Sequence, residues 1–440
     1  MVIGLGRGDA VWNAPGVATG GQAAARPRVL VLGGGFAGIG AARALKKADV
    51  DVVLVDRHDY HTFQPLLYQL ATGLLEQTAV GHSLRDLVKN QSNATIHKAP
   101  ITGIDLAAKQ ASFDGLASIT YDFLLLALGA QVNYFGTGGT PEHAFPMYTL
   151  PDAVRLKNHI LGRWEAADKD SALVDDGALT VVVVGGGPTG VETAGAIAEL
   201  YRDNFVKDYP GLPQEKARIV LVEAGEEIFA MFKPNLREYA KDALEQRTVE
   251  VLTGARVQSV SPTRVTLASG EAIAAHTLVW GAGLQGNSLV QSLGIELERG
   301  NRIAVGPDLE LPGHPGVYVV GDIAAITDSK TEQVLPQLGS VALQSGEHAA
   351  ETIARTVGGK PTKPFAYRDK GTMAAIGRNA AVVQMLGGRT MKGWKAQAAW
   401  RTVHLALLPT NEDRAKAVVD WAGSQLTHQR VGRISVDEDE

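Results

Sequence analysis

Two glycine-rich stretches of the chain have the residue types and spacing needed to hold nucleotide phosphates. They are Gly33-Gly34-Gly35-Phe36-Ala37-Gly38 and Gly185-Gly186-Gly187-Pro188-Thr189-Gly190, and both have the form G-x-G-x-x-G. In this pattern the first glycine permits a tight turn, the second lets the backbone approach a pyrophosphate, and the third lets the following helix pack closely. The free N–H groups at the start of that helix then bind the phosphates. The sequence therefore predicts two dinucleotide sites in one chain.

Strands and helices must flank each glycine stretch if this chemistry is to work. The runs RVLVL (28–32) and LTVVVV (179–184) have the apolar character of strands buried on both faces of a parallel sheet. Helix formers follow each glycine stretch, and a second strand then ends in an acid, Asp56 or Glu223. A carboxylate there accepts hydrogen bonds from ribose hydroxyls. An acid in the second copy favours NAD over NADP, because a 2′-phosphate would meet like charge.

A glycine–acid pair late in the chain indicates which nucleotide each copy holds. The run VYVVGDIAA (317–325) reads as a strand ending in Gly321-Asp322. A carboxylate at this position can reach the ribityl hydroxyl or phosphate region of a flavin. We therefore assign a flavin to the first copy and a nicotinamide nucleotide to the second.

Composition excludes several classes of protein. The 440 residues suffice for two or three domains, and a net charge of −5 gives no reason to expect nucleic acid as a partner. The absence of cysteine excludes disulfide scaffolds, thiolate metal sites and redox-active thiol pairs. No apolar stretch reaches the roughly 20 residues of a spanning helix. Residues 1–27 are expected to form a disordered tail without targeting function, which favours a cytoplasmic location. No metal site is expected.

Further phrases resemble known families. YDFLLLALGA (121–130) and LVWGAGL (278–284) are similar to the strands that close the two domains of two-dinucleotide flavoprotein reductases. The branches of that superfamily that use redox-active cysteines are excluded. Three stretches resemble type II (non-proton-pumping) NADH:quinone oxidoreductases, namely HTFQPLLYQLATG (61–73), GGGPTGVETAGAIAEL (185–200) and YRDKGTMAAIGR (367–378).

This resemblance implies a mechanism and a set of site residues. NADH would pass a hydride to FAD, and a quinone would re-oxidise the flavin without proton pumping. Glu192 matches the family's functional glutamate, although it also suits a helix N-terminus, where the dipole favours an acid. Lys370 matches a lysine near the isoalloxazine, where a cation stabilises an anionic reduced flavin; the alternative is a solvated surface lysine. Gln64 lies in a segment that the family places near the flavin.

The chain departs from the family pattern where the acceptor is expected to bind. Family members carry Ala-Gln after the Gly-Asp pair, and the glutamine is thought to contact the quinone head group. Here residues 335–344 read LPQLGSVALQ, with Gly339 and Ser340 at those positions. Serine keeps a hydroxyl donor but has a shorter reach. Gln337 or Gln344 can compensate, and Gln344 matches a separate family glutamine.

The candidate residues fall into three groups. Those expected in catalysis are Glu192, Lys370, Gln64, Ser340 and Gln344. Those expected to bind the FAD are Gly33, Gly35, Phe36, Ala37, Gly38, Asp56, Arg57, Gln64, Gly129, Gly321 and Asp322. Those expected to bind NAD are Gly185, Gly187, Pro188, Thr189, Gly190, Glu192, Glu223, Gly281 and Gly283.

The C-terminal region is expected to be helical. Residues 394–408, with Trp394 and Trp400, have the apolar character of a membrane-surface helix, and a helical dimer interface is the alternative. Thr410 and Asp413 have capping-box spacing, which predicts the start of a second helix. We therefore expect a homodimer that is peripheral on the inner face of the cell membrane.

The predicted fold class is α/β, with two Rossmann-type domains and a C-terminal helical segment. The expected FAD-binding domain comprises residues 28–150 and 301–360, the NAD-binding domain residues 151–300, and the C-terminal segment residues 361–440. The predicted function is an FAD-dependent NADH dehydrogenase with a quinone, menaquinone or ubiquinone, as acceptor. Two alternatives stay open: a reductase of a soluble or ferredoxin-type protein acceptor, and a redox-sensing flavoprotein.

Overall fold

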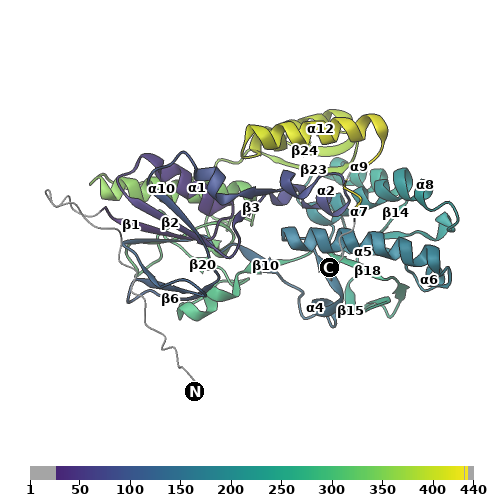
Figure 1. Ribbon diagram of the computed structural model, residues 1–440, viewed down its shortest axis with the longest axis horizontal. Helices are drawn as coiled ribbons and strands as arrows, with labels where there is room; N and C mark the ends of the chain where they lie inside the picture. Colours follow the sequence, from purple (N-terminus) through teal and green to yellow (C-terminus); the bar gives the residue numbers. More distant parts are fainter. Residues whose placement is uncertain (1–25, 431, 435–440) are drawn as a thin grey trace, which may run out of the picture.

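The computed structural model describes residues 26–430 and 432–434. The tail predicted for residues 1–27 therefore lies, up to residue 25, outside the described residues. Figure 1 shows two halves joined side by side, with a third layer across the top of one of them.

A parallel sheet forms the core of the first half. Its strand order is β21-β9-β1-β2-β5, with β1 (Arg28–Leu32), β2 (Asp51–Asp56), β5 (Ala94–Lys98), β9 (Phe123–Leu126) and β21 (Val317–Val319). Helices α1 (Phe36–Ala44) and α10 (Gly339–Val357) pack together above the sheet in Figure 1. A small antiparallel sheet lies below it, formed by β6 (Ile101–Asp105), β7 (Gln110–Phe113) and β8 (Ile119–Thr120). The predicted strand at 28–32 and the predicted second strand that ends in Asp56 are confirmed.

A second parallel sheet repeats this plan. Its order is β11-β18-β12-β13-β14, with β11 (Ala144–Pro146), β12 (Val181–Val184), β13 (Ile219–Val222), β14 (Val249–Leu252) and β18 (Thr277–Trp280). Val181 and Val183 pack into the core shared with the helices α5 (Leu150–Lys169), α7 (Pro188–Leu200) and α9 (Pro234–Glu245). Val182 and Val184 face the other way, into a core with the antiparallel strands β15 (Val257–Ser261), β16 (Arg264–Leu267) and β17 (Ala272–Ala274). Both faces are covered, which explains why the strand is apolar throughout.

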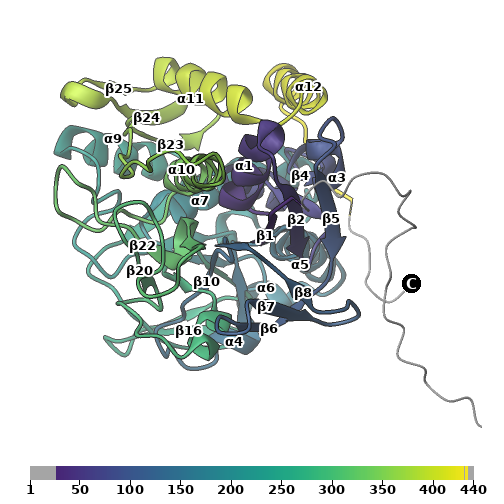
Figure 2. The same cartoon turned by 90° about the vertical axis from the view of Figure 1, so that its left-hand side faces the viewer.

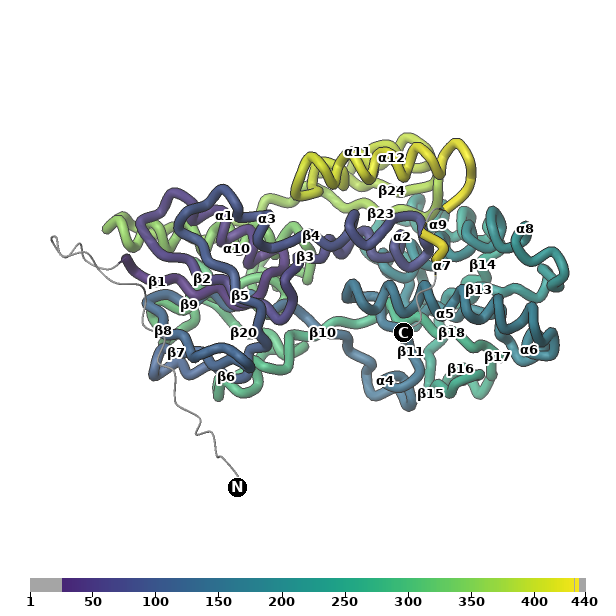
Figure 3. Tube along the Cα trace, viewed as in Figure 1, coloured from purple at the N-terminus to yellow at the C-terminus, as the bar shows by residue number. Residues whose placement is uncertain are grey.

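Two antiparallel strands carry the chain between the halves. They are β10 (Ala130–Val132) and β19 (Leu284–Gly286), and the tube in Figure 3 shows β10 crossing from one half to the other. The strand β11 already pairs with β18 in the second sheet. The chain thus enters the second half before the domain limit expected at residue 150, and it returns before the limit expected at residue 300.

The C-terminal region forms a separate layer. An antiparallel sheet of β23 (Thr372–Gly377), β24 (Ala380–Gln384) and β25 (Thr390–Lys392) lies beneath the helix α11 (Trp394–Leu407), and α12 (Asn411–Thr427) lies to the side of α11, as Figure 2 shows. Strand β23 approaches α7 so closely that a Cβ on Gly195 would lie 1.9 Å from the carbonyl oxygen of Ile376. The hydroxyl of Thr410 accepts a hydrogen bond from the N–H of Asp413 at 3.2 Å, so the predicted start of the second helix is confirmed.

One expectation about this layer is wrong. Trp400, expected at a membrane surface, is only 1% exposed and packs with Tyr68, His404 and Trp421. Its position on α11 faces the core, because the helix must cover the apolar side of β24. Trp394, at the start of the same helix, is 66% exposed. Among the described residues, the helices are all too short or too polar to cross a bilayer.

Short elements complete the two halves. The remaining helices are α2 (Leu67–Ala71), α3 (Leu84–Val88), α4 (Thr140–His143), α6 (Ala172–Asp175) and α8 (Val206–Asp208). The remaining strands are β3 (Tyr60–Thr62), β4 (Gly81–Ser83), β20 (Ile303–Ala304) and β22 (Ala324–Ala325). Helix α2 follows β3 of the first structural half but packs on α5 and α7 of the second, so it joins the two halves.

Candidate functional site

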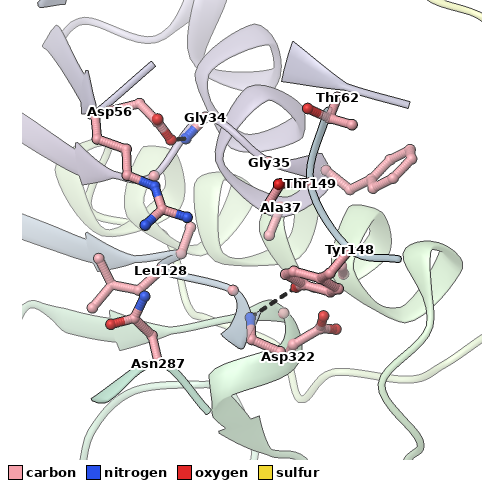
Figure 4. Close-up of a pocket in the computed structure, with 18 of the residues that line it drawn as sticks. Gly34, Gly35, Ala37, Asp56, Thr62, Leu128, Tyr148, Thr149, Asn287 and Asp322 are labelled. Atoms are coloured by element: carbon pink, nitrogen blue, oxygen red, sulfur yellow. Dashed lines mark hydrogen bonds between the residues drawn. The ribbon is translucent and has the colours of Figure 1, made fainter. Parts of the chain in front are cut away.

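A cavity of about 630 Å³ opens at the carboxyl end of the first sheet. Figure 4 shows that residues from several loops surround it, among them Gly35, Asp56, Tyr148 and Asp322. The predicted cofactor-binding residues that line it are Gly33, Gly35, Phe36, Ala37, Asp56, Arg57, Gln64, Gly129, Gly321 and Asp322. The topology thus gathers residues from five separate stretches of the chain around one space.

The first glycine stretch has the geometry that its spacing predicts. Gly33 has a φ of +108°, and a Cβ there would lie 2.2 Å from the carbonyl oxygen of Ala127. A Cβ on Gly38 would lie 1.8 Å from the carbonyl oxygen of Gly33, so the helix starts against the turn itself. Gly35 lines the cavity, and no protein atom lies within 4 Å of the place a Cβ would occupy. The first and third glycines therefore serve the fold, whereas the second leaves room for a ligand.

Asp56 links the end of β2 to the glycine turn. One carboxylate oxygen accepts the N–H of Gly34 at 2.6 Å, and the other accepts the N–H of His58 at 2.7 Å. The carboxylate lines the cavity, and its remaining lone pairs can accept ribose hydroxyls. Asp56 therefore holds the phosphate-binding turn and faces the ligand space at once.

Asp322 lies at the opposite part of the cavity. Burial raises the pKa of this carboxyl, while the Arg302 guanidinium and the Tyr148 hydroxyl favour its ionised form. Tyr148 is partly buried, and loss of solvation raises its pKa to about 12. The Tyr148 hydroxyl accepts a hydrogen bond from the N–H of Ala130 at 3.0 Å, drawn as a dashed line in Figure 4. This tyrosine ties the loop before α5 to the start of the crossing strand.

Several lining residues were not expected to bind the cofactor. Tyr148, Thr62 and Asn287 face the cavity, and so does Gln337, whose predicted role was a compensating contact to the acceptor. Gln337 also donates from its side-chain amide to the carbonyl oxygen of Asp322 at 3.1 Å. Tyr148, Thr62 and Asn287 lie far apart in the sequence and share no spacing pattern, so only the folded topology reveals them.

The second glycine stretch is built in the same way. Gly185 has a φ of +113°, and a Cβ on Gly190 would lie 1.8 Å from the Gly185 carbonyl oxygen. Gly187 leaves open space, as Gly35 does. Glu223 follows β13 and accepts the N–H groups of Gly186 at 2.5 Å and Gly225 at 2.6 Å.

The loop after β18 completes this second site. A Cβ on Gly281 would lie 3.1 Å from the N–H nitrogen of Gly190, so the loop rests on the start of α7. Pro188 and Thr189 occupy the first turn of that helix, where free N–H groups can bind an anion. The predicted residues Gly185, Gly187, Pro188, Thr189, Gly190, Glu223, Gly281 and Gly283 thus lie together at the carboxyl end of the second sheet.

Glu192 lies on α7 but faces away from both glycine turns. Its carboxylate accepts the N–H of Ala375 in β23 at 2.9 Å, and burial raises its pKa to about 8. It lines a second cavity of about 40 Å³ together with Tyr68, Gln69 and Arg401. The resemblance pointed to this residue, but neither its burial nor its raised pKa could be read from the sequence.

The other predicted catalytic residues line neither cavity, apart from Gln64. The Ser340 hydroxyl is hydrogen-bonded to the Tyr367 hydroxyl at 2.9 Å. The Gln344 side chain exchanges hydrogen bonds of 3.1 and 3.0 Å with the backbone of Arg368. Lys370 follows in the same segment and is exposed. Helix α10 therefore fixes the segment that leads to Lys370, while Gly339 and Gln337 line the first cavity.

Comparison with known proteins agrees with this arrangement. Residues 27–346 match the pyridine nucleotide-disulphide oxidoreductase family, and residues 370–430 match the NDH2 C-terminal domain. The type II NADH:quinone oxidoreductase NdhA of Mycobacterium tuberculosis is 35% identical over 428 residues, covering 93% of this chain and 89% of that protein. Ndh of the same organism is 34% identical, covering 94% and 91%.

A solved structure shows the same fold. The structure of NDH2 from Plasmodium falciparum in complex with NADH superimposes with a TM-score of 0.85 at 19% identity. It covers 94% of this chain and 100% of that one. The likeness extends over both sheets and the C-terminal layer.

Proposed function

The chain belongs to the type II NADH:quinone oxidoreductases, and we propose that it transfers two electrons from NADH through FAD to a quinone. The observation that carries this proposal is the pair of matching nucleotide sites at the carboxyl ends of two parallel sheets. The sequence contains no cysteine, so a thiol pair cannot serve as the electron acceptor. The electrons must therefore leave to an external acceptor.

The first cavity fits FAD. Its volume of about 630 Å³ is in the range of sites for large cofactors, and it runs from Asp56 and Arg57 to Asp322 and Gln337. We propose that Asp56 binds the adenosine ribose, the N-terminus of α1 the pyrophosphate, and Asp322 the ribityl region. Bound FAD supplies the redox chemistry, by accepting a hydride from NADH and returning two electrons to the quinone.

We propose that the second site binds NADH. Glu223 would accept hydrogen bonds from the adenosine ribose, and its charge would repel a 2′-phosphate. Gly187 leaves the pyrophosphate room to reach the N-terminus of α7. The loop from Gly281 to Gly283 then lies along the path toward the first half, where the nicotinamide must meet the flavin.

We propose that Glu192 takes part in proton uptake and that Lys370 stabilises negative charge during the reaction. The overall reaction, NADH + H⁺ + quinone → NAD⁺ + quinol, takes up one proton. Glu192 holds a proton at neutral pH because burial raises its pKa to about 8. Lys370 is proposed to stabilise negative charge as the electrons arrive. Its segment is held by the hydrogen bonds of Gln344 to the backbone of Arg368, two residues before it.

A soluble or protein acceptor is the second candidate. The observation that favours it is the position of Ser340, whose hydroxyl is engaged by Tyr367 and does not line the cavity. A redox-sensing role would require that every acceptor re-oxidises the reduced flavin slowly. The rate at which a quinone re-oxidises the flavin therefore distinguishes quinone reduction from reduction of a protein acceptor and from sensing.

We propose further that the chain is a homodimer peripheral on the inner face of the membrane. Large apolar side chains on α11 and α12 are exposed, namely Val403, Leu407, Val418, Val419 and Leu426. With Trp394, they add apolar area to the surface of this layer. Either a membrane or a second copy would cover it.

Identification of the released cofactor and anaerobic reduction test the proposal. The purified protein should release FAD, not FMN, on denaturation, and NADH should bleach its flavin absorbance. A protein without flavin, or a flavin that NADH does not reduce, would contradict the proposal.

A further inference from the structure

Phe135 is an exposed aromatic residue in a strained backbone conformation. Its φ is +52°, in the left-handed region that bulky residues avoid, and its side chain is 64% exposed. It belongs to none of the hydrophobic cores formed by the described residues. Its ring is therefore not explained by packing within the chain, and strain of this kind is concentrated at functional sites.

Neighbouring groups hold this conformation in place. The N–H of Phe135 donates to the side-chain oxygen of Asn133 at 2.8 Å. The N–H of Asn133 donates to the carbonyl oxygen of Gly283 at 3.1 Å, and the indole N–H of Trp280 donates to the Asn133 carbonyl oxygen at 3.1 Å. The turn that presents Phe135 is thus anchored to both ends of the loop that follows β18.

The Phe135 ring lies directly beside Gly283, in the loop that follows β18. A Cβ on Gly283 would lie 2.4 Å from the Phe135 ring, so the absence of a side chain at Gly283 makes room for it. Gly281, two residues earlier, rests on the start of α7. Phe135 therefore comes from the crossing between the halves but borders the second glycine site.

The strand order of the second sheet indicates which part of a bound dinucleotide lies near Gly283 and Phe135. In the order β18-β12-β13, the glycine turn follows the central strand β12, and Glu223 follows β13 on one side. A dinucleotide whose adenosine ribose is bound by Glu223 crosses the turn with its pyrophosphate. Its other half then extends over β18, where Gly283 and Phe135 lie.

We propose that the Phe135 ring packs against the nicotinamide nucleoside half of bound NADH. This inference rests on the proposed function and adds a specific contact to its nicotinamide site. An aromatic ring buries apolar surface against a planar ring or a ribose at little cost in side-chain entropy. The turn at Asn133 aims the ring across Gly283, which has no side chain to block it.

The substitution Phe135→Gly separates binding from folding. Glycine adopts a positive φ freely, and the lost side chain is mostly exposed, so the thermal midpoint should stay the same or rise. The dissociation constant of NAD⁺, measured by calorimetry on the flavin-loaded full-length protein, should rise by about threefold to tenfold. ADP, which lacks the nicotinamide nucleoside, should bind to the variant as it binds to the unchanged protein.

Two control variants are measured with the same ligands. Phe135→Tyr keeps the ring and should bind NAD⁺ normally, and Val206→Ala removes an exposed apolar side chain on α8 and should change neither ligand. Unchanged NAD⁺ binding in Phe135→Gly would overturn the inference. So would an equal loss for ADP and NAD⁺, because the ring would then act on the adenosine half or the loop. Failure of the unchanged protein to bind NAD⁺ would instead contradict the proposed function.

Discussion

The carboxylate of Glu192 accepts a hydrogen bond from the backbone N–H of Ala375 at 2.9 Å. This bond joins the first turns of α7, which follow the nicotinamide glycine turn, to the first strand of the C-terminal layer. The carboxyl group is buried there, and its raised pKa of about 8 keeps it protonated at neutral pH. The C-terminal layer and the helix that follows the second glycine turn are thus joined through one acid.

The substitution Glu192→Gln should change how stability depends on pH. The unfolded chain loses this proton near pH 4.5 and the folded chain near pH 8. Between these values the folded state binds more protons, so the free energy of unfolding falls as pH rises, by at most about 1.4 kcal/mol per pH unit. Glutamine cannot ionise, and its side-chain oxygen still accepts the Ala375 N–H.

Urea unfolding from pH 4.5 to pH 9 measures this effect. The stability of Glu192→Gln relative to the unchanged protein should rise across the window and level off above about pH 8. Parallel pH curves for the two proteins would show that Glu192 is ionised in the folded state at neutral pH.

Substitution of Gly35 should affect flavin binding, whereas substitution of Gly38 should affect folding stability. Gly35→Ala should change the free energy of unfolding of the flavin-free protein by less than about 0.5 kcal/mol, because the new methyl group meets no protein atom. It should nevertheless lower flavin content, since the methyl group points into the cavity. Gly38→Ala should destabilise the protein by about 1–3 kcal/mol, because its Cβ collides with the Gly33 carbonyl oxygen.

Flavin absorbance per chain and urea unfolding of the flavin-free protein provide the two measurements. Full flavin retention in Gly35→Ala would mean that the pyrophosphate does not approach this residue.

Glu223→Gln should weaken discrimination between the two nicotinamide nucleotides. The substitution removes the negative charge that a 2′-phosphate would meet, while an oxygen remains to accept one backbone N–H. The ratio of kcat/KM for NADH to that for NADPH should fall by roughly tenfold. Asp56→Asn is the matched control, because it alters the same position in the flavin site and should leave the ratio unchanged.

Substitution of the two tryptophans of α11 should affect different properties, namely stability for Trp400 and vesicle binding for Trp394. Trp400→Ala should destabilise the protein by about 3–5 kcal/mol, because the side chain is only 1% exposed. Trp394→Ala combined with Leu426→Ala should leave the thermal midpoint unchanged and reduce sedimentation with anionic vesicles, since both side chains are exposed. Undiminished vesicle binding by the double variant would contradict the proposed membrane-facing surface.

Local patterns predicted much of the fold. Strand β1, the glycine turns and the cap at Thr410 depend on neighbouring residues, so their spacing alone indicates them. The crossing between halves was harder to locate, because β11 pairs with β18 across a separation that no local pattern encodes. The burial of Trp400 was missed for a similar reason, since an amphipathic helix does not say which partner covers its apolar side.

The candidate site was predictable only in part. Asp56 ends the strand that follows the first glycine stretch, Asp322 follows a glycine at a strand end, and the cavity contains both. Tyr148 and Asn287 lie in loops with no spacing signal and reach the cavity through tertiary structure. The positive φ of Phe135 could not be foreseen either, because the hydrogen bond from its N–H to the side chain of Asn133 fixes that turn.

Double-mixing anaerobic stopped flow tests the central claim most directly. The flavin is first reduced with one equivalent of NADH, and a water-soluble menaquinone analogue is then added while the visible absorbance is followed. The account predicts fast bleaching followed by fast recovery of the oxidised flavin. Fast bleaching without recovery would contradict quinone reduction and leave a protein acceptor or a sensor as the function.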